Sequence, residues 1–259
     1  VALSAPPAEY VCRAVSVAPT LDGKPTEACW RSAATPPVFH ALGGDIAGPK
    51  TELRMLYDQE NLYVAVQTAT GGDAVPVPGR KRQRDGRVWN DPGVELFLQT
   101  NPALAETMQL VLNSGNAIFD EFPAKGGKSW NPEWRHAANA FPGGWSAEMA
   151  IPFAALGVAT PKKGFVWRVR VGTNTPGQPH TMWPQNRSTS FHNPACWAYL
   201  VFGEANLLPN GGFEGALNGK GVPQGWLFHY HDAEGKGKIE VVEKDAPEGK
   251  RLVRYEKFR

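Results

Sequence analysis

The sequence predicts an all-β protein, a β-sandwich of antiparallel strands with one or two short helices. Three observations support this fold class. Short runs of alternating apolar and polar residues recur along the chain, turn-forming residues separate them, and helical periodicity is scarce. The 28 glycines, 23 prolines and nine tryptophans fit a protein with many turns, whose aromatic side chains pack a core or bind a flat ligand.

A hairpin is the clearest local element of this pattern. Residues 52–57 and 62–67 are two β-rich runs, and the polar residues 58–61 between them are typical of a turn. Strands of this kind at short spacing favour a sandwich over a helical or mixed fold. The other predicted strands are residues 94–99, 107–113, 117–120, 145–151, 166–171 and 197–202.

Helices are expected at two places only. Residues 25–33 have Pro25 in the first turn, where its missing N–H and fixed φ are tolerated. Residues 152–156 form a second short helical pattern, which Gly157 ends.

The charge balance bears on possible partners. The chain has 27 basic and 25 acidic residues, a net charge of +2, and its basic run at 79–87 reads as a solvated loop. Nucleic-acid binding is not expected, because it needs clustered cations facing phosphates. No apolar run reaches the roughly 18 residues of a membrane-spanning helix. We expect a monomer without a membrane span.

Strand alternation selects a set of candidate ligand-binding residues. Glu95, Asn113 and Arg170 each lie in mid-strand on the face opposite the apolar residues. The simplest interpretation is a solvated sheet face. The alternative is a concave face for a hydroxyl-rich ligand, because planar polar groups bind vicinal hydroxyls and aromatic rings stack on sugar C–H faces. Trp89 and Phe191 would supply the rings.

The three cysteines carry a second prediction. Cys12, Cys29 and Cys196 show no C-x-x-C spacing, which argues against a structural zinc site. First and last strands are often neighbours in sandwiches, so we predict a Cys12–Cys196 disulfide, with Cys29 free and buried beside Trp30. A secreted location would permit such a bond.

A domain boundary is expected near Glu204. Residues 5–204 are long enough for one sandwich, whereas residues 205–259 are too few for a second, which needs on the order of 100 residues. The C-terminal part is therefore either the beginning of another domain or a segment that packs on the first.

Enzymatic and cofactor chemistry has weak support. Glycoside hydrolysis would need a pair of carboxyl groups, for which Asp91, Glu95 and Glu148 are the candidates. No Gly-x-Ser-x-Gly or phosphate-binding loop is present. Residues 229–232 (HYHD) could bind a metal but fit a surface strand better, and a haem-binding sandwich would need axial ligands such as His180 and Met182.

Six segments together resemble carbohydrate-binding modules of family nine. They are residues 19–30 (PTLDGKPTEACW), 56–64 (LYDQENLYV), 88–97 (VWNDPGVELF), 109–113 (QLVLN), 145–152 (WSAEMAIP) and 190–194 (SFHNP). The resemblance covers residues 11–202, with the segments in order. It implies an immunoglobulin-like or jelly-roll sandwich that binds the ends of oligosaccharides or polysaccharides without catalysis. It also implies a bacterial, secreted or periplasmic system that degrades carbohydrates, in which a glycoside hydrolase accompanies the module.

The resemblance assigns roles to the same candidates. Trp89, six residues before Glu95, and Phe191 match two stacking aromatics, while Glu95 and Asn113 match polar contacts. Three departures are Val111 in place of a charged contact, Arg170 in place of an amide, and Phe191 in place of Trp. A scaffold domain with a decayed sugar site is therefore the alternative function.

Two further implications of the resemblance concern calcium and the C-terminal part. Such modules can hold structural calcium, but the corresponding loop at residues 70–76 has one carboxylate, so no site of that type and no other cofactor is predicted. Residues 206–226 resemble the opening of a family-four carbohydrate-binding jelly roll.

Overall fold

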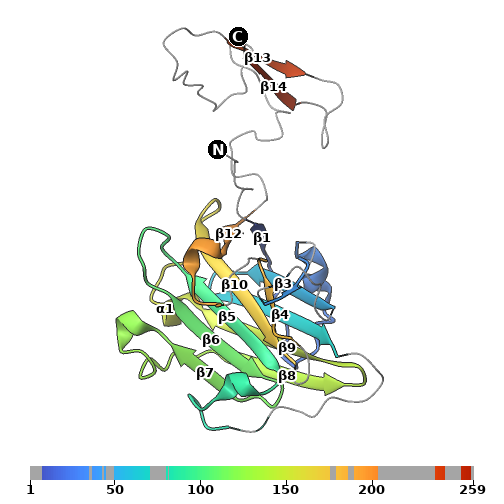
Figure 1. Ribbon diagram of the computed structural model, residues 1–259, viewed down its shortest axis with the longest axis vertical. Coiled ribbons are helices and arrows are strands. Elements are labelled where there is room, and N and C mark those ends of the chain that lie inside the picture. Colours follow the sequence, from blue (N-terminus) through green and yellow to red (C-terminus); the bar gives the residue numbers. More distant parts are fainter. Residues whose placement is uncertain are drawn as a thin grey trace. The chain divides into compact units, whose positions relative to one another are not determined.

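The computed structural model describes most of the N-terminal part of the chain. The described residues are 8–34, 37–42, 44, 50–70, 80, 82–175, 179–185, 190–203, 237–242 and 252–257. The chain divides into two compact units, Val1–Glu204 and Ala205–Arg259. The first unit is a β-sandwich of two curled sheets, which confirms the predicted fold class (Figure 1).

The first sheet carries the predicted ligand-binding residues. Its strands follow the order β7–β6–β5–β10–β12–β1. Strand β10 pairs with β12 through its first half and with β11 through its second half, and β11 also pairs with the short β2. All pairs are antiparallel except β12 with β1, which is parallel. The bounds are β1 Glu9–Ala14, β2 His40–Ala41, β5 Gly93–Gln99, β6 Met108–Asn113, β7 Ile118–Glu121, β10 Val166–Asn174, β11 Thr181–Trp183 and β12 Ala198–Phe202.

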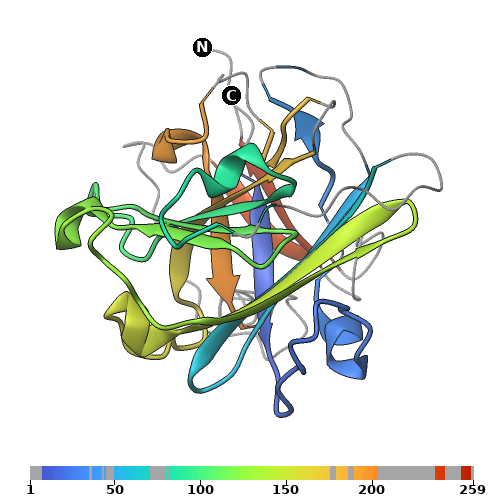
Figure 2. The same cartoon turned by 90° about the horizontal axis from the view of Figure 1, so that it is seen from below.

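The second sheet has the order β1–β3–β4–β9–β8. Strand β1 belongs to both sheets, since residues 9–12 pair with β12 and residues 13–14 pair with β3. Figure 2 shows the green strands β5–β7 in one layer and the cyan and yellow-green strands β4 and β9 running together in the other. The bounds are β3 Thr51–Tyr57, β4 Asn61–Ala69, β8 Arg135–Phe141 and β9 Gly144–Pro152.

The core fills the space between the sheets with apolar side chains from the inward-facing positions of the strands. Its buried members include one residue from each of six strands, namely Leu53, Val64, Leu96, Leu110, Met149 and Val169. At about 25 cal/mol per Å² of apolar surface, burying each such side chain contributes roughly 1.5–3 kcal/mol. The inward-facing set therefore fixes the register, because a shift by one residue would turn it outward.

The predicted elements agree closely with the structure. All eight strands predicted by residue range are present, with each bound shifted by three residues at most. Strands β2, β8 and β11 and the two strands at 237–242 and 252–257 were not predicted. The helix α1, Phe153–Leu156, ends at Gly157, whose φ of 77° suits glycine. The expected helix over 25–33 is a 3-10 helix, η1, Ala28–Ser32. Three more 3-10 helices are η2 Val88–Asn90, η3 Pro123–Lys125 and η4 Pro194–Cys196.

The predicted Cys12–Cys196 disulfide is not formed: Cys12, Cys29 and Cys196 are all free thiols. The first and last strands are neighbours as expected, but Cys12 aligns with Phe202 at one end of β12, and Cys196 precedes the other end. Cys12 is fully buried in the core, while Cys196 is partly exposed. Cys29 is free but only partly buried.

The second unit contains one described hairpin. Strands β13, Gly237–Val242, and β14, Leu252–Lys257, pair antiparallel. The stretch at 206–226 and the histidines at 229 and 231 lie outside the described residues, so the resemblance to a second jelly roll stays a prediction. Within the described part of the chain, no helix is long and apolar enough to span a membrane.

Candidate functional site

The outer face of the first sheet brings the predicted residues into register. Glu95 on β5 lies between Gly172 on β10 and Val111 on β6, and Phe119 on β7 follows in the same row. Because these residues are cross-strand partners, their side chains share one face. Glu95 is therefore the only ionisable residue of that row.

Glu95 is a desolvated carboxyl group with one hydrogen-bond partner in the described structure. Its side chain is 7% exposed, and Oε2 accepts a hydrogen bond of 2.9 Å from Nε2 of Gln109. Burial raises the pKa of Glu95 to about 7, against the opposing effect of the Gln109 hydrogen bond. The group can therefore act as a hydrogen-bond donor or acceptor close to neutral pH.

Phe191 closes the row on the β10 side. A Cβ added to Gly172 would lie 2.8 Å from Cζ of Phe191, so the ring sits directly on the glycine backbone. Phe191 is 9% exposed and packs against Phe97 on β5, with 5.9 Å between ring centroids. Its ring is thus a wall of the site rather than an open stacking surface.

Arg170 does not present its guanidinium to a ligand. The side chain is fully buried, Nη1 donates to the carbonyl of Ser190 at 3.0 Å, and Nη2 donates to that of Cys196 at 3.1 Å. Burial lowers the pKa of Arg170 to about 10. These bonds hold both ends of the segment that carries Phe191, so Arg170 positions that segment instead of hydrogen-bonding sugar hydroxyls as predicted.

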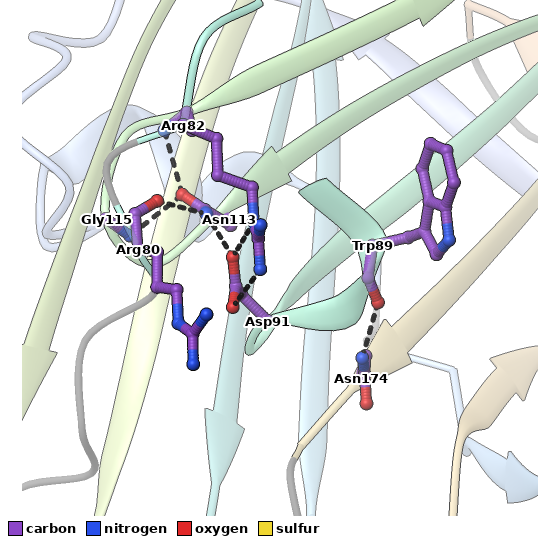
Figure 3. Close-up of polar contacts among 8 residues, drawn as sticks. Arg80, Arg82, Trp89, Asp91, Asn113, Gly115 and Asn174 are labelled. Atoms are coloured by element: carbon purple, nitrogen blue, oxygen red, sulfur yellow. Dashed lines mark hydrogen bonds and ion pairs between the residues drawn. The ribbon is translucent and has the colours of Figure 1, made fainter. Parts of the chain in front are cut away.

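Asn113 is also committed to the protein. Its Oδ1 accepts the backbone N–H groups of Gly115 and Ala117 at 3.0 and 2.8 Å, and its Nδ2 donates to the carbonyl of Arg80 and to Oδ2 of Asp91. Asn113 is fully buried. Its amide shapes the turn after β6 and fixes Asp91, rather than contacting a ligand as predicted (Figure 3).

Trp89 in η2 is the most open of the five predicted residues. It is partly exposed, whereas the other four are buried. Its ring packs edge to face on Phe119, with centroids 5.0 Å apart and planes at 82°, and its carbonyl accepts a 2.6 Å hydrogen bond from Nδ2 of Asn174. Figure 3 shows the indole pointing away from the Asp91–Asn113 network.

Lys128 is a site residue that sequence reasoning missed. Its Nζ lies 5.6 Å from the ring centroid of Trp89 and 5.4 Å from that of Phe119. These distances place the ammonium within cation–π range of both rings. Lys128 follows η3, about 40 residues after Trp89, and no local pattern connects the two positions.

The carboxyl groups considered for glycoside hydrolysis have structural roles in two of three cases. Asp91 accepts two hydrogen bonds from Arg82, at 2.5 and 3.0 Å. Glu148 lies on β9 of the other sheet and accepts from Nε1 of Trp30 and from the backbone N–H of Gly23 at 3.0 and 2.8 Å. Asp91 and Glu148 therefore both serve as hydrogen-bond acceptors within the protein, and neither is left to form a catalytic pair with Glu95.

The cofactor alternatives gain no support from the described residues. Met182 is fully buried and packs in one apolar cluster with Phe97, Phe191 and Trp197. No group of three or more His, Cys, Asp or Glu that could hold a metal occurs within the described ranges. Apart from Thr70, the loop at 70–76 lies outside them.

Two facing, mostly antiparallel sheets define a β-sandwich, and a partly exposed indole is fixed on the outer face of the first sheet. The sequence matches the family described as Carbohydrate family 9 binding domain-like over residues 21–207. The chain belongs to this family. The predicted resemblance to family nine is thereby confirmed.

Solved structures with the same fold agree with this assignment. A protein from Bacteroides uniformis ATCC 8492, to which carbohydrate binding has been ascribed, is 14% identical with a TM-score of 0.59, covering 76% of this chain and 100% of that one. A family 9 module from Caldicellulosiruptor kristjanssonii was solved with glucose and with cellotriose. Each of its structures is 16% identical with a TM-score of 0.55, over 76% of this chain and 97% or 95% of that one. A search of curated proteins gives no match.

Proposed function

We propose that residues 5–204 bind the end of an oligosaccharide or polysaccharide on the outer face of the first sheet, as a non-catalytic module of a secreted or periplasmic bacterial system that degrades carbohydrates. One observation carries the proposal. Trp89 offers a partly exposed indole, held by Phe119 and Asn174, on the same face as the desolvated Glu95. An apolar ring beside a polar group is the combination that sugars require.

The side chains divide into ligand contacts and supports. Trp89 would stack on the C–H face of a sugar ring, and Glu95 would hydrogen-bond a hydroxyl. Arg170 and Asn113 hydrogen-bond neighbouring backbone segments, and they would support the site by holding these segments in place without touching the ligand. Phe191 would limit the length of the site, because its ring covers Gly172.

Two lines of similarity support a sugar ligand. Family membership points to carbohydrate binding in general. The Caldicellulosiruptor kristjanssonii module with the same fold was solved with glucose and cellotriose, which makes β-linked glucose oligomers a sensible part of the first test. A glycoside hydrolase as the companion of this module remains part of the proposal.

Titration calorimetry of wild type and Trp89→Ala against mono- and oligosaccharides, each with its borohydride-reduced form, tests the proposal. We expect Trp89→Ala to weaken binding by about 30-fold, because buried aromatic anchors contribute 2 kcal/mol or more. Phe165→Ala is the matched control, since Phe165 is 53% exposed just before β10, at the end away from Gly172. Binding lost on reduction would locate the site at a reducing end.

A decayed site on a scaffold domain is the second candidate. The internal hydrogen bonds of Asn113 and the burial of Phe191 and Arg170 favour it, since three of the five predicted contacts serve the fold. Equal affinities of wild type and Trp89→Ala, or silence across all sugars, would support the scaffold and contradict the proposed binding.

A further inference from the structure

We propose that the sugar bound at Trp89 carries an anionic group, a carboxylate or a sulfate, which Lys128 beside the indole recognises. This inference rests on the proposed function, because it concerns the ligand class of the same site. It follows from three features of the site: which charges are already paired, which cations are left, and which neutral polar groups are already used.

The acidic side chains near Trp89 are largely paired. Arg82 forms an ion pair with Asp91 at 2.5 Å, and Arg84 forms one with Asp120 at 2.8 Å. Asp91 is nearly buried and Asp120 completely so. These two carboxylates therefore cannot neutralise further cations at the surface.

One cation lies at the indole itself. Lys128 reaches over the Trp89 and Phe119 rings, and Arg87 directly precedes η2 in the chain. Both side chains are exposed, and neither has an ion pair within the part of the chain that the structure describes. Their five-donor and three-donor head groups are built to bind oxyanions.

The neutral groups suited to sugar hydroxyls are mostly used internally. The Asn113 amide makes four hydrogen bonds to the protein, and the Asn174 amide donates to the Trp89 carbonyl. Asn90 beside Trp89 is an exposed exception. Beyond stacking, the site thus selects a ligand chiefly through charged donors.

The remaining carboxyl groups do not cancel this preference. Burial raises the pKa of Glu95 to about 7, so a large fraction of this group is uncharged near neutral pH. Oδ1 of Asp85 accepts the backbone N–H of Asp120, and Glu121 is partly buried next to Gly127. Neither Asp85 nor Glu121 forms an ion pair with Lys128 in the described part of the chain, so the ammonium group over the indole keeps its charge for a ligand.

A matched pair of lysines provides the test. Lys125 and Lys128 both lie at η3, but Nζ of Lys125 is 5.7 Å from the ring centroid of Phe122 and near Gly157, away from Trp89. Lys128→Met and Lys125→Met remove the same charge from the same loop. Only Lys128→Met should affect ligand binding, because only Lys128 reaches the indole.

Calorimetry at low ionic strength compares glucose with glucuronate, galactose with galacturonate, and each neutral sugar with its sulfate ester, as the end groups of short oligosaccharides. We expect at least one acidic member to bind fivefold or more tightly than its neutral partner. Lys128→Met should weaken that binding by about threefold, as for an exposed ion pair, and Lys125→Met should not. Added salt should reduce the preference. Comparing the affinities of the uronates with those of the sulfate esters identifies which anion is recognised.

The outcomes separate this inference from the proposed function. Neutral sugars that bind as tightly as acidic ones, with affinity lost in Trp89→Ala, would overturn the anionic ligand and keep the sugar site. An acidic preference that Lys128→Met leaves unchanged would overturn the role assigned to Lys128. No binding by any sugar would contradict both.

Discussion

The two outer faces of the sandwich each carry a glutamate in mid-strand, yet the two groups have different surroundings. Glu148 on β9 is completely buried and accepts hydrogen bonds from Trp30, Gly23 and Asp22, all from the segment that covers the second sheet. Glu95 on β5 has one side-chain partner, Gln109, and is 7% exposed. Burial raises the pKa of both carboxyl groups.

The difference shows how one strand pattern produces two roles. On the second sheet the glutamate is a structural acceptor that fixes a covering segment to the strands. On the first sheet the glutamate has one partner among the described residues, Gln109, and so keeps hydrogen-bonding capacity for a ligand. Ligand binding is expected where a desolvated polar group is not fully satisfied by the protein.

The largest expected effect concerns the satisfied glutamate. Glu148→Ala should lower the free energy of unfolding by about 4 kcal/mol, because it leaves three donors without their acceptor under the covering segment. Urea denaturation measures the change. Glu95→Ala, which frees only Gln109, should cost clearly less. Equal losses would mean that the two faces do not differ as described.

Asn113→Ala should show that this amide is structural. The substitution removes four hydrogen bonds and leaves buried N–H groups at residues 115 and 117, so we expect a loss of about 3 kcal/mol. Thermal unfolding followed by circular dichroism measures it, with exposed Asn90→Ala as the control. A stable Asn113→Ala variant with weakened sugar binding would instead restore the predicted ligand contact.

Local sequence patterns were sufficient for most of the fold. Alternation placed Leu96, Leu110 and Val169 in the core and Glu95 outside, because strand geometry assigns faces residue by residue. The 3-10 helix at Ala28–Ser32 shows the limit, since tertiary packing of Trp30 overrides a weak helical pattern.

The roles of the site residues depend on contacts that no local pattern contains. Asn113 bonds to Arg80 and Asp91, which are 33 and 22 residues away, and Arg170 bonds to carbonyls 20 and 26 residues away. Strand alternation indicates that such a side chain leaves the core, but not whether another segment covers it. The loop segments that cover Asn113 and Arg170 turned two predicted contacts into supports.

The pH dependence of stability should separate Glu95 from the rest of the molecule. Its folded-state pKa of about 7 lies above the ordinary 4.5, so between these values the folded protein keeps a proton that the unfolded chain has lost. Stability should fall as pH rises through this window and level off above it. Glu95→Gln should match wild type near pH 4 and exceed it by about 2 kcal/mol near pH 8.

Urea denaturation of both proteins from pH 4 to 8 measures that difference. Comparing the two proteins is necessary because burial also raises the pKa values of Glu148 and Asp120, which contribute slopes of the same sign. These slopes are common to both proteins and cancel in the difference. A constant gap between wild type and Glu95→Gln across the range would contradict a raised pKa at Glu95.

The smallest expected effect tests the wall that the Phe191 ring forms over Gly172, beside Glu95. Gly172→Ala places a Cβ 2.8 Å from Cζ of Phe191, so the ring must move by a few tenths of an ångström. The strand backbone tolerates alanine, and we expect a stability loss of about 1 kcal/mol. Because the displaced ring lies beside Glu95, sugar affinity should change by about fivefold while that of Phe165→Ala stays at the wild-type value. An affinity unaffected by Gly172→Ala would mean that the ligand contacts the Trp89 side of the face alone, and that Phe191 belongs with Arg170 and Asn113 among the supports.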